Sequence, residues 1–235
     1  TDAAFGGLGG FDFKAIGDGP AVTGAGGVGT GVGTGTRGGS GGDGVGFGGR
    51  GAGMRKAMVG GFGGTKQSER AVAAGLNWIA RHQNPNGSWS IQGFSARCKG
   101  GTCNGQGSAK SDTAATALAL LPFLAAGQTH ESKGPYQKNI YAGLHWLINN
   151  QGKDGNLAAG SSSLMYSHGL ASIVLCEAFG MTKDRSIGVA AQGALRFIET
   201  AQDRVGGGWR YTPGQPGDTS VVGWQVMALK SGQMS

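Results

Sequence analysis

Three side chains that could form a disulfide or bind a metal lie in and before one long turn of the chain. Cys98 and Cys103 are separated by Lys-Gly-Gly-Thr, and His82 precedes them. A glycine-rich loop can bend to bring two sulfurs within bonding distance, so a Cys98–Cys103 disulfide and two free thiols both remain open. A closed structural zinc site needs four ligands, and His82 is the only histidine nearby. We therefore expect no metal ion and no cofactor. Cys176 falls in an apolar stretch and is expected in the core.

A second group of reactive side chains stands near the beginning of apolar segments. His168, in Tyr-Ser-His-Gly, could bind a ligand, act as an acid or base, or tie two helices by hydrogen bonds. Asp112 and Asp218 each precede an apolar run, where a carboxylate most often caps a helix. These three residues are the candidate catalytic residues, each with a structural alternative.

The same segment starts also carry groups that could hold a phosphate. Free N–H groups and the positive dipole end make a helix N-terminus attractive to anions. Four residues lie close in sequence to such predicted ends and are the candidate ligand-binding residues: Lys110, His168, Arg210 and Tyr211. The hypothesis requires that they converge in space.

Repeated segments supply the elements that must position these side chains. Residues 74–89, 142–157 and 193–209 are alike. Each has an aromatic residue, then a glutamine five residues on, then a glycine-containing turn; the aromatic residues are Trp78, Trp146 and Phe197, and the glutamines are Gln83, Gln151 and Gln202. Such regularity indicates a repeated structural unit.

Apolar helices of another kind are predicted between the repeated segments. They start near Ser111 or Asp112, near Leu164 and near Asp218, and glycines at 127, 180 and 232 stand where helices should end. The repeated segments have polar faces, whereas these helices are apolar on most sides. The chain from residue 65 to 235 is therefore expected to be all-α, built from about three stacked helical hairpins.

The turn Gln83-Asn84-Pro85-Asn86-Gly87-Ser88-Trp89 resembles the repeat motif of squalene and oxidosqualene cyclases. Residues 202–209 fit a looser form, and residues 151–157 replace the tryptophan by leucine. The resemblance implies a partial α/α toroid in which five residues are structural: Gln83, Trp89, Gln151, Gln202 and Trp209. Residues 165–184 and 207–233 also look like bacterial proteins known only as prenyltransferase or squalene-oxidase repeat proteins, a description of repeats rather than of an activity.

The chemistry of these relatives is not matched by the residues present. Cyclases protonate an alkene with an Asp-x-Asp-Asp-Thr-Ala motif, and the corresponding residues here are 109–114, Ala-Lys-Ser-Asp-Thr-Ala. Ser111 stands where the proton donor should be, and a hydroxyl is far too weak an acid for that step. The Asp-x-Cys pair that helps bind zinc in protein prenyltransferases does not occur.

The sequence resembles these families but lacks their catalytic acid and their zinc ligands. It therefore favours a binding or scaffolding module, whose ligand could be an isoprenoid or another apolar molecule. The alternative is an isoprenoid-acting enzyme, a terpene cyclase or a prenyl transferase, whose catalytic residues lie outside this sequence. An open arc of hairpins would also leave apolar side chains bare at its two ends, which predicts self-association or further repeats. Those side chains are Trp78, Ile79, Val222, Trp224 and Met227.

Composition and charge limit the remaining classes of function and partner. The chain has 51 glycines in 235 residues, concentrated in residues 1–64, which predicts a flexible, disordered arm. The net charge is +7 without a dense basic run, so we expect no nucleic-acid partner. No run of about 18 apolar residues is evident, so no membrane span is expected. The chain begins at Thr1, and a targeting or anchoring segment upstream would leave its compartment open.

Overall fold

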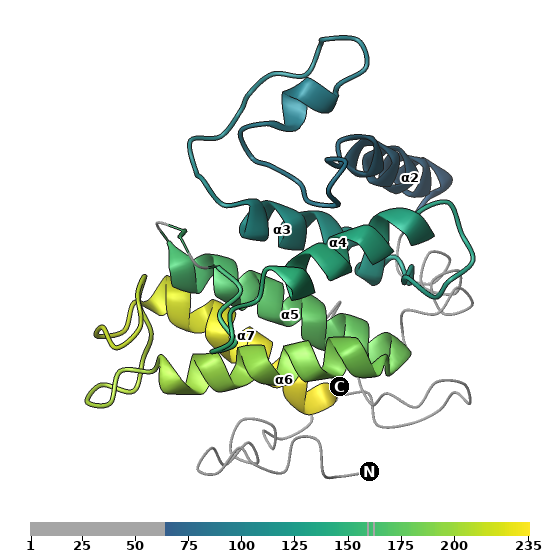
Figure 1. The fold of residues 1–235 in the computed structure, drawn as a ribbon. Coiled ribbons are helices and arrows are strands. Elements are labelled where there is room, and N and C mark those ends of the chain that lie inside the picture. Colours follow the sequence, from purple (N-terminus) through teal and green to yellow (C-terminus); the bar gives the residue numbers. More distant parts are fainter. Residues whose placement is uncertain (1–63, 159, 162) are drawn as a thin grey trace.

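The computed structural model describes residues 64–158, 160, 161 and 163–235, so the predicted glycine-rich arm lies outside the described residues except for Gly64. The described part contains six α-helices, one short 3-10 helix and no strand, which confirms the all-α prediction (Figure 1). The elements are α2 (Lys66–Arg81), η3 (Phe94–Arg97), α3 (Asp112–Ala125), α4 (Gln137–Asn149), α5 (Leu164–Thr182), α6 (Arg185–Thr200) and α7 (Thr219–Met234).

The helices alternate between two layers along the chain. In one layer α5 lies between α3 and α7 and packs against both. The other layer consists of α2, α4 and α6. Here α2 packs against α3, α4 packs against α3 and α6, and α6 packs against α5 and α7. Figure 1 shows α5 in the middle of the molecule, with the connection between α2 and α3 extending away from the bundle. The two predicted kinds of helix therefore occupy different layers.

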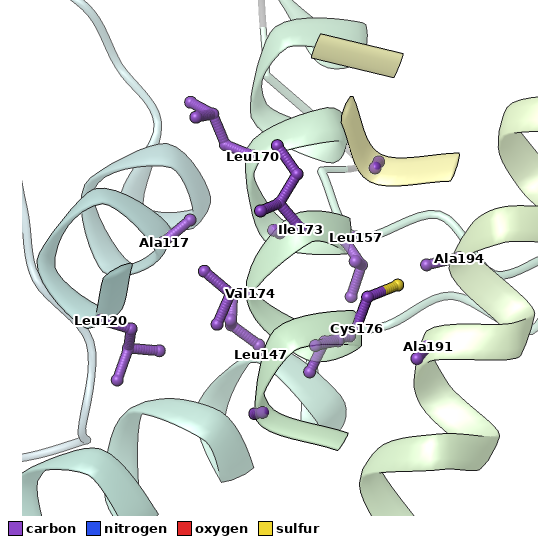
Figure 2. Packing of buried hydrophobic residues seen from close by; sticks show 14 of the residues in the cluster. Ala117, Leu120, Leu147, Leu157, Leu170, Ile173, Val174, Cys176, Ala191 and Ala194 are labelled. Atoms are coloured by element: carbon purple, nitrogen blue, oxygen red, sulfur yellow. The ribbon is translucent and has the colours of Figure 1, made fainter. Parts of the chain in front are cut away.

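The core is centred on α5, which is buried on nearly every side. Figure 2 shows Leu170 and Val174 on the side of α5 that faces α3, and Cys176 directed toward α6. Small residues on the neighbouring helices, such as Ala117 on α3 and Ala194 on α6, let the backbones approach. By length and composition α5 could cross a membrane, which the sequence reasoning had not anticipated, but 72% of its apolar window is buried inside the protein.

Gln83 and Gln151 each join their own turn to the next repeated helix, which is α4 for Gln83 and α6 for Gln151. The Gln83 side-chain amide donates to the carbonyls of Gly87 (2.8 Å) and of Asn139 (2.9 Å), near the start of α4. Gln151 repeats the pattern in the next hairpin. Its amide donates to the carbonyl of Gly155 (3.0 Å) and to that of Ala190 in α6 (2.9 Å). The two glutamines thus hold successive hairpins together through the same pair of hydrogen bonds.

The turn glycines complete this contact between hairpins. Gly87 has φ +93° and a Cβ there would lie 2.5 Å from the carbonyl oxygen of Ala142. Gly155 has φ +91° and a Cβ there would lie 2.1 Å from the carbonyl oxygen of Gly193. Ala142 and Gly193 occupy equivalent positions in the repeated segments. Only glycine permits both the backbone conformation and the close approach.

The tryptophans cover the turns from the other side. The indole N–H of Trp89 donates to the carbonyl of Ile79 (2.7 Å), and that of Trp209 donates to the carbonyl of Ile198 (2.7 Å). Both rings are buried. The Trp209 indole satisfies a carbonyl in the last turn of α6, and the Trp89 indole gives the Ile79 carbonyl a second hydrogen bond beside the one from the His82 N–H (3.1 Å).

Three predicted helix ends differ from the structure. The cap of α3 is Ser111, whose hydroxyl accepts from the Ala114 N–H, while Asp112 is the first helical residue. Gly180 and Gly232 lie inside α5 and α7, not at their ends. Gly232 serves packing instead, since a Cβ there would lie 2.4 Å from Leu195 Cδ1. The predicted glycine end after α3 is correct, because Gly127 follows the cap with φ +75°.

Candidate functional site

A pocket of about 510 Å³ opens beside the first turn of α3. Its walls come from the α2–α3 connection, the start of α3, the end of α4 and the turn before α5. The lining residues are Ser90, Gln92, Ala109, Lys110, Ser111, Asp112, Thr113, Trp146, Asn150, Leu157, Ala158, Gly160 and Ser161. Most of these side chains are polar, and Lys110 and Asp112 bring opposite charges to the same site.

The pocket includes Ser111, the residue that the resemblance to cyclases aligns with their proton donor. Its hydroxyl is 2.7 Å from the hydroxyl of Ser167 on α5. The Ser111 oxygen also accepts the N–H of Ala114. Asp112 is exposed at the pocket wall and is the only carboxylate among the lining residues. The Ser111 hydroxyl can offer a hydrogen bond to a ligand, but neither serine is a strong acid.

His168 lies on α5, and the structure gives it a buried, fully hydrogen-bonded position. Its Nδ1 accepts the Leu157 N–H (3.1 Å), so the proton is on Nε2, which donates to the Ala194 carbonyl (3.0 Å). The ring has no exposed surface. It joins the turn before α5 to α6, and a ligand in the pocket cannot reach it.

Burial lowers the pKa of His168 to about 4, against an ordinary value near 6.5. The folded chain therefore keeps this ring neutral in a range where the unfolded chain binds a proton. The free energy of unfolding should fall as the pH decreases from about 6.5 to about 4, and His168 contributes about 3 kcal/mol of that loss.

Urea unfolding at pH 7 and at pH 4.5 measures this contribution when the wild type is compared with His168→Gln. The variant should be less stable than the wild type at pH 7, because the amide replaces the ring contacts imperfectly. Its stability should fall less between the two pH values. Equal falls in the two proteins would contradict the assignment.

Arg210 and Tyr211 lie in the turn before α7, away from the residues that line the pocket. The Tyr211 ring stacks on Tyr166 with centroids 5.9 Å apart, and the Arg210 guanidinium lies over the Tyr211 ring. Of the four predicted ligand-binding residues, the pocket contains Lys110 alone. The described structure therefore does not bring those four together.

Asp218 caps α7. Its carboxylate accepts hydrogen bonds from the Ser220 hydroxyl and from the backbone N–H groups of Ser220 and Val221. The hydrogen bond from Ser220 is the main reason that the pKa of Asp218 lies below its ordinary value. A carboxylate held in the ionised form is a poor proton donor. The structure thus accounts fully for Asp218 as a helix cap, which was the structural alternative to a catalytic role.

His82, Cys98 and Cys103 form a second polar cluster outside the pocket. Their ligand atoms all lie within 4.8 Å of one another. The His82 Nε2 is 3.3 Å from Cys103 Sγ, and its Nδ1 is 2.6 Å from the Trp78 carbonyl oxygen. Both sulfurs are free thiols in the structure, so the disulfide that the sequence left open is not formed there.

A third cluster contains His130 and Asp184. His130 Nε2 is 3.1 Å from Asp184 Oδ2, and the other oxygen of Asp184 caps α6. The Ser186 hydroxyl is the main cause that lowers the pKa of Asp184 to about 2. A helix cap and the contact with His130 account for Asp184, whereas the His130 Nδ1 is buried without a hydrogen-bond partner in the described structure.

Comparison with protein families adds a second line of evidence to this geometry. Residues 54–163 match the family model of the squalene-hopene cyclase C-terminal domain. This part of the chain is similar to that family. A search of the curated proteins and a search of the solved structures gave no match.

The part that matches the squalene-hopene cyclase C-terminal domain contains α2 to α4, all the residues that line the pocket and the histidine–cysteine cluster. It includes the segment in which the cyclase acid motif would be expected. Sequence reasoning named Lys110 and Asp112 as site residues but gave Trp146 only a place in the repeat and did not name Asn150. Their position in the last turn of the helix that leads to Gln151 was the available signal.

Proposed function

We propose that residues 64–235 are a binding module of the squalene-cyclase type that does not turn over its ligand. The observation that carries this proposal is the hydroxyl of Ser111 at the donor position, paired with Ser167 in place of a carboxylic acid. Alkene protonation needs a strong acid close to the substrate. Neither hydroxyl can supply it.

The polar pocket beside α3 is the proposed binding site. Its wall offers the ammonium group of Lys110, the amides of Gln92 and Asn150 and several hydroxyls, whereas apolar side chains are few. A long isoprenoid chain would bury little of its surface there, because binding of such chains depends on apolar contact. We therefore propose a small polar ligand and not the apolar molecule that the family resemblance implies.

A comparison of inorganic pyrophosphate with farnesyl diphosphate tests this proposal, since the two share a charged group and differ by an apolar chain. Calorimetry should give affinities within about threefold, because the pocket adds no apolar contact for the chain. Lys110→Ala should weaken both by about tenfold, the loss of roughly one charge-assisted hydrogen bond. Lys138→Ala, an exposed residue of α4 that does not line the pocket, is the matched control and should change neither.

The alternative, an isoprenoid-acting enzyme, predicts different results. Farnesyl diphosphate would bind orders of magnitude more tightly than pyrophosphate, at about 0.8 kcal/mol for each buried methylene group. Incubation of the full chain with squalene would give a cyclic product, and Asp112→Asn would abolish it. Either result would contradict the proposal of a non-catalytic module with a polar ligand.

A further inference from the structure

The connection between α2 and α3 is much longer than the turns that join the other hairpins. It runs from His82 to Ser111, and its only regular element is the single 3-10 turn η3. Loops of this length without secondary structure are uncommon in compact domains unless they serve a function. Side-chain hydrogen bonds tie it together, including those from Arg97 to Asn84 (3.1 Å) and from Gln106 to Ser95 (2.6 Å).

This connection folds so that two cysteines face the end of α2. Cys98 follows η3, and its carbonyl accepts the N–H groups of Gly100 (2.9 Å) and Gly101 (3.3 Å). Both glycines have positive φ, at +146° and +66°, which reverses the chain within four residues. Cys103 is thereby returned toward Cys98, beside His82 at the end of α2.

The ring of His82 is held in the orientation of a metal ligand. Its Nδ1 must carry the proton, because the Trp78 carbonyl 2.6 Å away can only accept. In the neutral ring Nε2 then has a free lone pair, and it points at Cys103 Sγ 3.3 Å away. Histidines that bind metals usually donate their other N–H to a carbonyl or a carboxylate in this way. His82 is 3% exposed, and Trp78 stacks on its ring at 4.0 Å.

We infer that His82 Nε2, Cys98 Sγ and Cys103 Sγ bind a Zn²⁺ ion, with a water molecule as the fourth ligand. Two thiolates and an imidazole match the ligand preference of zinc, and three protein ligands with a water is a known tetrahedral arrangement. Such a tetrahedron places ligand nitrogen and sulfur about 3.5 Å apart and two sulfurs about 3.8 Å apart. The observed 3.3 Å between His82 Nε2 and Cys103 Sγ is close to the first of these distances, and the Cys98 sulfur lies within 4.8 Å of both atoms. The inference concerns a site outside the pocket and does not rest on the proposed function.

Both thiols would bind the ion as thiolates, and their protons are released when the metal binds. The chain has three cysteines and four histidines. Cys176 is buried in α5, and His168 uses both ring nitrogens, so neither competes for the ion.

Titration of the reduced, chelator-treated full chain with Zn²⁺ and with Co²⁺ tests the inference. We expect one ion per chain, a higher midpoint of thermal unfolding with zinc, and thiolate-to-cobalt charge-transfer bands in the near ultraviolet. Bound zinc should also protect Cys98 and Cys103 from labelling by iodoacetamide. Cobalt binding without thiolate bands would overturn the site.

Variants identify the ligands. Cys98→Ser, Cys103→Ser and His82→Gln should each weaken zinc binding by more than about 100-fold, since the loss of even an outer partner costs roughly 10–100-fold. The controls Cys176→Ala and His145→Gln should bind zinc like the wild type. Wild-type affinity in both cysteine variants would overturn the inference. So would a Cys98–Cys103 disulfide in the purified chain whose reduction yields no zinc binding.

Discussion

Gly155→Ala is expected to lower the free energy of unfolding by about 4 kcal/mol, combining the cost of overpacking with that of a left-handed backbone for a residue with a Cβ. The new Cβ would lie 2.1 Å from the Gly193 carbonyl oxygen, which is backbone of α6 and cannot turn aside. The turn must then separate from α6, and the hydrogen bond from Gln151 to Ala190 is lost with it. The midpoint of urea unfolding measures the effect.

Gly207→Ala is the matched control, because Gly207 has the equivalent role in the third turn. Its carbonyl accepts the Gln202 amide (2.6 Å), as those of Gly87 and Gly155 accept theirs. It has φ +74°, but a Cβ there would meet no atom within 4 Å. This variant should therefore lose about 1 kcal/mol from backbone strain alone. Equal losses at Gly155 and Gly207 would show that contact between hairpins does not determine the effect.

The helices and their turns could be predicted from the sequence because their causes are local. Apolar spacing predicts the buried and the half-exposed layers, and Ser111 and Asp218 were among the predicted caps because a short polar side chain before an apolar run has few other uses. The errors at Gly180 and Gly232 have one origin. Glycine can end a helix or admit a neighbouring side chain, and the sequence does not distinguish the two.

The candidate sites depend on contacts between distant residues, which local patterns do not contain. Ser111 meets Ser167, 56 positions later, and Gln83 meets Asn139 at the same separation. The pocket exists because the end of α4 lies opposite the start of α3. His82, Cys98 and Cys103 were all noticed in the sequence, where a count toward four protein ligands led to the expectation of no metal ion; the zinc site that we propose instead uses three protein ligands and a water.

The exposed ends of the arc were anticipated less completely. Trp78 and Met227 are exposed, at 40% and 47%, whereas Ile79, Val222 and Trp224 are partly buried against the core. Trp78 also covers the His82 ring, so part of its exposure belongs to the histidine–cysteine cluster. The self-association expected from bare hairpin ends remains a prediction.

Trp89→Ala is expected to lower the free energy of unfolding by about 4 kcal/mol, within the range for removal of a large buried aromatic side chain. The ring is 5% exposed and packs so closely on α4 that a Cβ at Gly143 would lie 2.9 Å from its Cζ3. Its removal leaves a cavity between α2, α3 and α4. It also removes one of the two hydrogen bonds to the Ile79 carbonyl at the end of α2, which keeps the bond from the His82 N–H.

Trp89→Phe separates these two effects, because phenylalanine fills much of the space but has no N–H to donate. It should lose about 2 kcal/mol, the sum of a smaller cavity and one missing hydrogen bond. Trp209→Ala removes the equivalent ring of the third repeat, which bonds Ile198 in the same way, and should cost as much as Trp89→Ala if the role is structural. Urea midpoints measure all three variants, and pyrophosphate titration at 25 °C measures binding by the folded protein. An unchanged midpoint for Trp89→Ala with weaker pyrophosphate binding would make Trp89 a ligand-binding residue and contradict its assignment to the turn.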